Sequence, residues 1–143
     1  MPVPVPVHHA HAHAANHRSV EQQIVHLVNR ARRRHGLGRL HRSRRLAFVA
    51  GAHSLDMASH HELSHSSSNG QSFAQRLHYF THARVVGETI AEVTGRGSAR
   101  TVVRAWLHSA PHRAELLCGS FTHIGIGVVN QGGSRIVTAD FAS

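Results

Sequence analysis

Three stretches of the chain carry apolar residues at helical spacing, and each one begins at a serine suited to cap a helix. Ser19 begins the first stretch, where SVEQ forms a capping box and Gly36 is the expected stop. Ser43 begins the second stretch and Ser98 the third. The pattern therefore predicts three helices whose apolar faces are, in chain order, Ile24, Leu27, Val28 and Ala31; Leu46, Val49, Ala50 and Met57; and Val102, Val103, Ala105, Trp106 and Leu107.

Shorter elements are expected between and after these helices. Residues 73–77 have room for one or two helical turns, and a short helix follows from Pro111, which suits the first helical position. VVGETIAEV (85–93) fits neither period well, so it stays open between strand and helix. The chain ends in an expected hairpin, whose strands 122–130 and 134–142 are joined by the turn QGG. Helices first and antiparallel strands last indicate an α+β fold.

Residues 1–18 differ in composition from the rest of the chain. They are rich in proline and histidine, and HHAHAHAANH has no apolar residue larger than alanine to bury. We therefore expect residues 1–18 to be disordered and 19–143 to form one domain, which is long enough for a core of its own. The prolines and the lack of a basic region argue against a signal peptide. The histidines of this segment suit loose chelation of a transition metal, and a solvated tail is the alternative.

The charged residues are strongly basic. All sixteen basic residues are arginine, and the formal net charge is +9. Such a charge favours anionic surfaces, whether nucleic acid, acidic cell-wall polymer or lipid headgroups. No helix-turn-helix spacing, zinc finger or aromatic stacking platform accompanies it, so we expect no specific nucleic-acid recognition. We interpret one arginine cluster as a solvated basic face or, alternatively, an anion-binding surface: Arg30, Arg32, Arg33, Arg34, Arg39, Arg42, Arg44 and Arg45.

Membrane spans and disulfides are not expected. No apolar run approaches the ~18 residues that a membrane helix requires. Cys118 is the only cysteine, so no intramolecular disulfide can form. Its place after AELL indicates a small structural residue at a helix end rather than a reactive thiol, and we expect the protein to be a monomer.

Four motifs follow one another in the order HELSHSSSNG (61–70), VGETIAEV (86–93), AWLHSAPHRAELL (105–117) and FTHIGIGVV (121–129). In this order and on this helix pattern they resemble the bacterial, cysteine-poor branch of the CAP superfamily. Its members are SCP-like domains related to cysteine-rich secretory proteins, antigen 5 and pathogenesis-related 1 proteins. HSLDMA (53–58) is similar to the second-helix motif of that branch, and the resemblance covers residues 19–142.

This resemblance implies an α-β-α sandwich with a central antiparallel sheet of about three strands and a surface cleft. The family's cleft residues correspond here to His65, Glu88 and His112. The helix break at Ser109–Pro111 is then what turns His112 toward the cleft. Ser109 stands where eukaryotic relatives carry a second glutamate, so the set of two histidines and two glutamates is incomplete and a catalytic role is less expected.

Two neutral imidazoles and a carboxylate suit a divalent metal, zinc first, with His65 and His112 as its ligands. Gaps of 23 and 24 residues match no local metal motif, so only the fold can assemble such a site. Alternatively, Glu88 accepts a hydrogen bond from an imidazole or a backbone amide, and the trio is a structural polar cluster. His53, on the apolar face of the second helix, is expected to be a packed and hydrogen-bonded core residue.

Three functions remain open. The first is an extracellular or cell-envelope binding module, with its basic face toward an anionic envelope. Its cleft would bind a divalent cation or a small ligand such as a lipid, and its cleft residues are His65, Glu88, Ser109 and His112. The second is a metal-assisted or His/Glu-assisted hydrolase of the peptidase type, for which His65, Glu88 and His112 are the candidate catalytic residues. The third is a basic protein that binds nucleic acid non-specifically.

Overall fold

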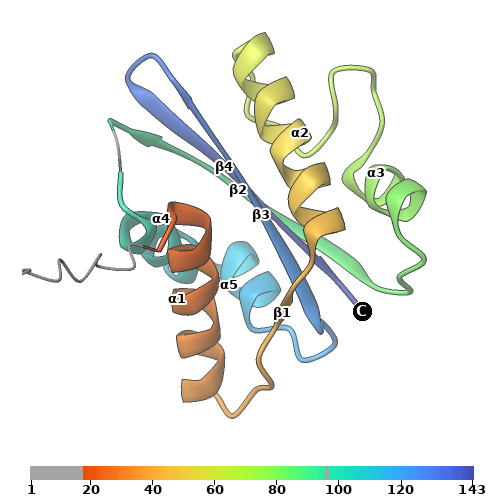
Figure 1. The fold of residues 1–143 in the computed structure, drawn as a ribbon, viewed down its shortest axis with the longest axis vertical. Coiled ribbons are helices and arrows are strands. Elements are labelled where there is room, and N and C mark those ends of the chain that lie inside the picture. The colour runs from red at the N-terminus through yellow and green to blue at the C-terminus, as the bar shows by residue number, and fades with distance from the viewer. Residues whose placement is uncertain (1–17, 96) are drawn as a thin grey trace, which may run out of the picture.

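A central sheet of four strands lies between two groups of helices in the computed structural model, which describes residues 18–95 and 97–143 (Figure 1). The strand order is β1 (His41–Arg42), β3 (His123–Gln131), β4 (Ser134–Ala142), β2 (Val86–Thr94). The three long strands pair antiparallel, and the short β1 pairs parallel with β3. The expected sheet of about three strands thus gains a fourth, because the chain before the second helix pairs with the start of β3.

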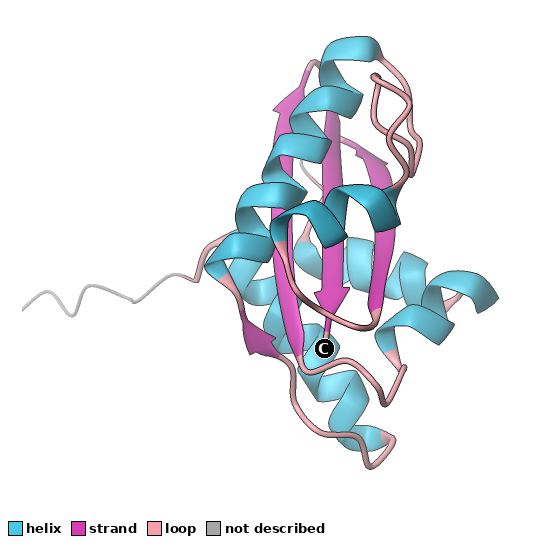
Figure 2. Cartoon of the chain, turned by 90° about the vertical axis from the view of Figure 1, so that its right-hand side faces the viewer, coloured by secondary structure: helices cyan, strands magenta, loops and turns pink. Residues whose placement is uncertain are grey.

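The helices cover both faces of this sheet. α2 (Arg44–His60) and α3 (Phe73–Phe80) pack on one face, toward the viewer in Figure 2. The other face is covered by α1 (Val20–Arg34), α4 (Ala99–Leu107) and α5 (Ala110–Leu116). The expected α+β fold and its α-β-α sandwich are therefore confirmed.

Local signals set most helix boundaries as expected. Ser19 and Gln22 form both bonds of the capping box, and Ser43 and Ser98 each accept a bond from the backbone amide three residues on. The segment that the pattern left open is the strand β2. α3 extends past residue 77 to Phe80, and α5 begins one residue before Pro111.

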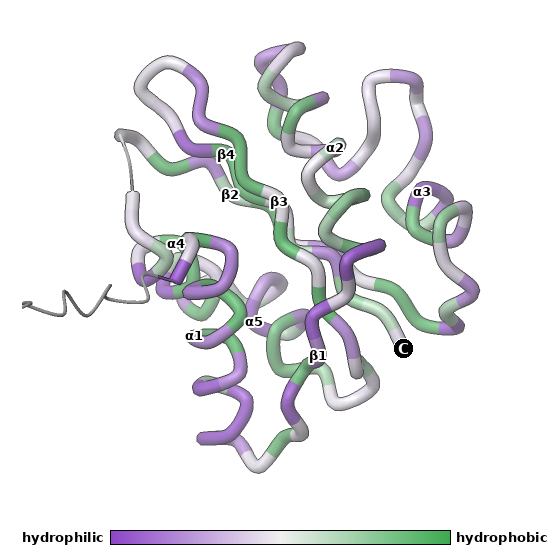
Figure 3. The backbone as a smooth tube through the Cα atoms, viewed as in Figure 1, coloured by the Kyte–Doolittle hydropathy of each residue, from purple (hydrophilic) through white to green (hydrophobic). Residues whose placement is uncertain are grey.

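Two hydrophobic cores follow from the alternation of side chains along the strands. Figure 3 shows the hydrophobic segments running through the sheet between the helices. In the larger core, Trp106 is 1% exposed and its indole Nε1 donates to the Ile90 carbonyl at 3.0 Å. That core includes Ile24, Val28, Val102, Trp106, Ile124, Val137 and Phe141, and the face under α2 buries Leu46, Val49, Met57, Leu77, Ile90 and Ile136.

Glycines on β3 let α2 lie directly on the sheet. A Cβ on Gly125 would overlap the backbone of Leu46 and Ala47, and a Cβ on Gly127 would overlap that of Ala50 and Gly51. Only glycine permits this close approach of helix and strand. It sets the height of α2 over the sheet and so places His53 above the β2–β4 pair.

The prediction that Arg32 belongs to an exposed basic face is wrong. Arg32 is only 1% exposed, because its guanidinium donates to the carbonyl oxygens of Gly38 (2.8 Å), Leu116 (2.9 Å) and Cys118 (2.8 Å). Arg32 therefore joins the end of α1 to the chain after α5. Cys118, which is half-buried, contributes its carbonyl to this contact.

The expectation that the Pro/His-rich N-terminal segment is disordered concerns residues 1–18, of which residues 1–17 lie outside the described residues. Among the helices of residues 18–95 and 97–143, none combines the length and the apolar character needed to cross a membrane.

Candidate functional site

Glu88 is the centre of a polar cluster buried between the sheet and α2. Its side chain is 0% exposed, and its Oε1 accepts a hydrogen bond from His65 Nδ1 at 2.9 Å. Its Oε2 accepts a hydrogen bond from Arg76, a buried residue of α3. His53 Nε2 lies 3.7 Å from Oε1. A carboxylate at this depth is stabilised only because charged and polar partners surround it.

The same residues hold the loop that carries His65. His53 Nε2 donates to the Ser64 carbonyl at 2.7 Å, which confirms that His53 is a packed and hydrogen-bonded core residue. Arg76 donates to the His65 carbonyl at 3.2 Å and to Ser67 Oγ at 2.9 Å. His65 is thus fixed through its backbone as well as through its ring.

Asp140 is a member of the cluster that the motifs did not reveal. It lies opposite Glu88 in the β2–β4 pairing and is fully buried. Burial, and then the negative charge of Glu88, raises the pKa of Asp140 well above its usual value. Burial alone would also raise the pKa of Glu88, but the hydrogen bond from His65, the adjacent Asp140 carboxyl and the charge of Arg76 hold it below its usual value. Burial and the charge of Glu88 therefore favour the protonated form of Asp140.

A sequence signal for Asp140 existed. It is the one acidic residue in SRIVTADFA, a segment already predicted to be a strand. An acid in a strand that is buried along most of its length needs a partner. Arg76 had no comparable signal, because its burial depends on how α3 packs beside β2.

His65 presents its second ring nitrogen away from Glu88. A carboxylate only accepts, so Nδ1 carries the proton and the neutral ring has its lone pair on Nε2. The side chain is 46% exposed. A histidine oriented by a carboxylate in this way is the usual arrangement around protein-bound metals.

His112 and Glu115 lie one turn apart on α5, on the same side of the helix. Burial lowers the pKa of His112, and the imidazole of His65, when it is protonated, lowers it further. Burial raises the pKa of Glu115, and His65 partly offsets this increase. α5 approaches β2 at Gly87, where a Cβ would overlap the Glu115 carboxylate. His112 and Glu115 therefore lie at the same end of β2 as His65.

The structure brings two of the three expected site residues, His65 and Glu88, into direct contact. His65 contacts Glu88, whereas His112 forms no hydrogen bond with either residue. Ser109 caps α5 by position but makes no side-chain capping bond. Within residues 18–95 and 97–143, no three or more histidine, cysteine, aspartate or glutamate side chains are grouped so that they could hold a metal ion. Both oxygens of Glu88 are already bonded, to His65 and Arg76.

The comparisons with known proteins agree on the fold. A family model described as "CAP: Cysteine-rich secretory protein family" matches residues 25–141. The "Uncharacterized protein YkwD" of Bacillus subtilis is 34% identical over 113 residues, which cover 78% of this chain and 43% of that protein.

Two solved structures are similar to this chain. One is an extracellular protein of Bacillus anthracis that contains an SCP domain (TM-score 0.78, 32% identity), where the match covers 86% of this chain and 40% of that one. The other is an outer surface protein of Borrelia burgdorferi (TM-score 0.76, 20% identity), with 84% and 89% covered. The chain thus spans less than half the length of YkwD and of the Bacillus anthracis protein.

Proposed function

This chain belongs to the CAP, or cysteine-rich secretory protein, family, and from that membership we propose that it is a binding module of the cell exterior or envelope. Its site at His65 and His112 takes up a divalent cation, zinc first, or a small ligand such as a lipid. The solved relative at 32% identity is an extracellular protein, which supports the location. The excess of arginine supports contact with an anionic envelope.

The hydrogen bond between His65 and Glu88 is the observation that carries the proposal. It fixes the ring orientation and the tautomer, so that Nε2 is presented as an acceptor at a half-exposed position. His112 lies near enough for the charge of His65 to affect its pKa, and it supplies the second imidazole. A bound zinc ion would supply a Lewis-acid centre for the carboxylate or phosphate of a ligand. The remaining coordination positions would be filled by that ligand or by water.

A binding role is favoured over hydrolysis by the state of Glu88. A general base must reach the proton that it removes, and Glu88 is wholly buried with both oxygens bonded. Among residues 18–95 and 97–143 no histidine is hydrogen-bonded to a serine hydroxyl, and the Thr122 hydroxyl that bonds His123 Nδ1 at 2.8 Å is exposed at the start of β3, outside the Glu88 cluster.

Zinc titration tests the proposal. We would use a variant lacking residues 1–17, because the histidines of that segment would bind zinc on their own. Calorimetry at about pH 7.5 should show binding of one ion, and affinity should fall strongly at about pH 5.5, because only neutral imidazole is a ligand. His65→Ala and His112→Ala should each remove binding.

His78→Ala is the matched control, because His78 is an exposed histidine of α3 that takes no part in the cluster. It should leave the zinc affinity unchanged. Loss of binding in this control, or zinc binding that survives His112→Ala, would contradict the assignment. A folded protein that takes up no zinc at either pH would leave His65, Glu88 and His112 as a polar cluster that supports the loop.

A further inference from the structure

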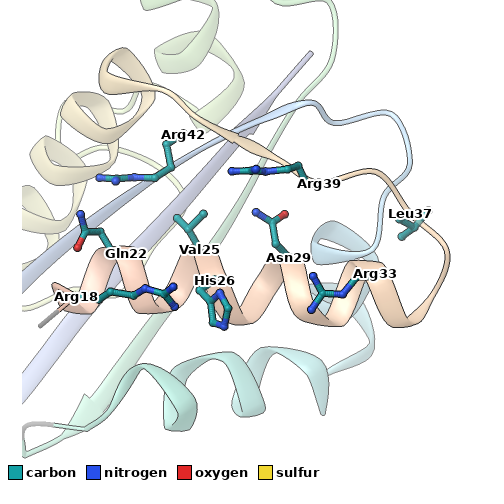
Figure 4. A pocket seen from close by; sticks show the side chains of 9 residues that line it. All are labelled: Arg18, Gln22, Val25, His26, Asn29, Arg33, Leu37, Arg39 and Arg42. Atoms are coloured by element: carbon teal, nitrogen blue, oxygen red, sulfur yellow. The ribbon is translucent and has the colours of Figure 1, made fainter. Parts of the chain in front are cut away.

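A groove lined by arginines runs along α1 and shares no residue with the His65 cluster (Figure 4). We name it the α1 groove. Its volume is about 660 Å³, and Figure 4 shows side chains of α1 facing those of the connection from α1 to α2. Arg18 and Arg33 lie on the α1 side, and Arg39 and Arg42 lie on the opposite side.

The two walls of the α1 groove are held together by the fold itself. Asn29 Nδ2 donates to the Leu40 carbonyl at 3.0 Å, and the Leu40 amide donates back to Asn29 Oδ1 at 2.7 Å. Arg32 binds the Gly38 carbonyl in the same connection. Since these bonds need no ligand, the groove is formed in advance, and little conformational entropy is lost when a ligand binds.

The four arginines have no structural task in the described protein. Arg18, Arg33, Arg39 and Arg42 are all exposed, and none has a carboxylate within 4.0 Å or a side-chain hydrogen bond in residues 18–95 and 97–143. Arg32 and Arg76, by contrast, serve the fold from buried positions. Gathering four like charges at one groove is unfavourable unless an anion offsets the repulsion.

The carboxylates of the protein lie mostly elsewhere. Glu88 and Asp140 are buried, and Glu115 packs against β2. Asp56, Glu62 and Glu92 belong to α2, the residues after it, and β2. Glu21 is the single acid of α1, and its side chain forms no ion pair with a described residue. Glu21 lines the neighbouring hollow together with Arg42, so one carboxylate stands near the four arginines of the groove and leaves an excess of positive charge there.

The remaining lining indicates the chemistry of the ligand. Gln22, His26 and Asn29 are polar, Val25 and Leu37 are the apolar members, and the lining has no Phe, Tyr or Trp, so His26 is the one ring that could stack on a base. The planar fork of arginine matches phosphate oxygens in pairs. From Val20 to Arg33 α1 rises about 20 Å, and Arg18 lies just before it, so the groove suits an extended ligand.

We propose that the α1 groove binds a linear polyanion of phosphate groups without bases, the chemistry that a phosphate-rich envelope polymer presents. This proposal deepens the envelope contact of the proposed function and rests on that part of it. It does not depend on the site at His65.

A second hollow gives a matched control. It lies between α1 and α4 and is also lined by four arginines, Arg30, Arg34, Arg100 and Arg104, but its floor includes the apolar Leu27, Val103 and Leu107. Removing two arginines from either hollow changes the net charge equally. If removing two arginines from the α1 groove weakens polyphosphate binding more than removing two from the second hollow, the groove itself is responsible and not the overall charge.

The experiment is calorimetric titration of the full chain with short-chain polyphosphate, with inorganic phosphate and single-stranded DNA in parallel. The Arg39→Gln/Arg42→Gln double variant should bind polyphosphate about tenfold or more weakly than the wild type. The Arg100→Gln/Arg104→Gln control should lose no more than about threefold. Because Arg39 and Arg42 are exposed and form no side-chain bonds with the described chain, both double variants should melt at the wild-type temperature.

Other outcomes would overturn the proposal. Equal losses in the two double variants would mean general attraction by net charge. DNA bound more tightly per phosphate than polyphosphate would assign the surface to nucleic acid, and binding confined to anionic lipid vesicles would assign it to a membrane. His65→Ala should leave polyphosphate binding intact, and the Arg39/Arg42 variant should keep the zinc response, so this proposal and the proposed function can fail separately.

Discussion

Glu88 and Asp140 lie directly opposite each other on β2 and β4, and both side chains are buried beneath α2. Neither oxygen of Asp140 has a hydrogen-bond partner among the described residues. Because burial and the adjacent charge of Glu88 raise the pKa of Asp140, the pair favours a single negative charge on Glu88, which Arg76 balances. This arrangement predicts different outcomes for the two acids.

Asp140→Asn should be tolerated, whereas Glu88→Gln should not. Asparagine keeps the size and neutrality of a protonated aspartate and can still donate, so we expect a loss below about 1 kcal/mol. Glu88→Gln leaves the buried guanidinium of Arg76 unpaired and should cost about 3–5 kcal/mol. Urea denaturation followed by the fluorescence of Trp106 measures both losses. Similar losses would show that Asp140 is ionised.

The stability of the wild type should depend on pH through Asp140. Folding raises its pKa, so the folded state keeps a proton that the unfolded chain releases above about pH 4. This contribution is fully present below that pH and is lost as the pH rises toward the folded pKa. Relative to Asp140→Asn, the wild type should lose up to about 1.4 kcal/mol per pH unit in that range. If the unfolding free energies of the wild type and of Asp140→Asn changed in parallel between about pH 5 and about pH 8, the prediction would be contradicted.

Arg32→Lys should destabilise the protein although the charge is kept. Lysine cannot direct donors to the carbonyls of Gly38, Leu116 and Cys118 at once, so a loss of about 2–4 kcal/mol is expected. Arg34→Lys is the control, because Arg34 is exposed at the end of the same helix. Its effect should stay within about 0.5 kcal/mol, and equal effects in thermal melts would mean that Arg32 is not a specific anchor.

Gly125 and Gly51 should respond in opposite ways to alanine. A methyl group on Gly125 would push α2 off the sheet, and overpacking of this kind costs about 1–3 kcal/mol or more. A Cβ on Gly51, within α2, would meet nothing within 4 Å. Because alanine is the better helix former, Gly51→Ala should gain about 0.5–1 kcal/mol. Chemical denaturation of both variants tests whether α2 lies as close to β3 as the structure shows.

Trp106→Ala should cost about 3–5 kcal/mol, because the side chain fills the larger core and its indole binds the Ile90 carbonyl. Trp106→Phe keeps an aromatic ring in the core and loses the hydrogen bond and part of the side-chain volume, so its cost should be smaller than that of the alanine variant. Far-ultraviolet circular dichroism during urea denaturation is suitable, since the chain has one tryptophan. A loss below about 1 kcal/mol for the alanine variant would mean that α4 packs differently.

The sequence by itself determined the features that depend on neighbouring residues. The serine caps at Ser19, Ser43 and Ser98, the stop near Gly36 and the C-terminal hairpin are where the pattern predicted them. Such signals arise from the hydrogen-bonding needs of a helix end or a turn, which are satisfied within a few residues. The order of four motifs likewise identified the family.

Only the tertiary structure decided the contacts between distant segments. VVGETIAEV becomes a strand because β4 pairs with it, and that pairing places Asp140 beside Glu88. The eight arginines between residues 30 and 45 share one composition, yet Arg32 is buried by carbonyls more than eighty residues away while Arg39 and Arg42 line an open groove. A local pattern carries no information about such partners, because burial is set by what the completed fold packs against each side chain.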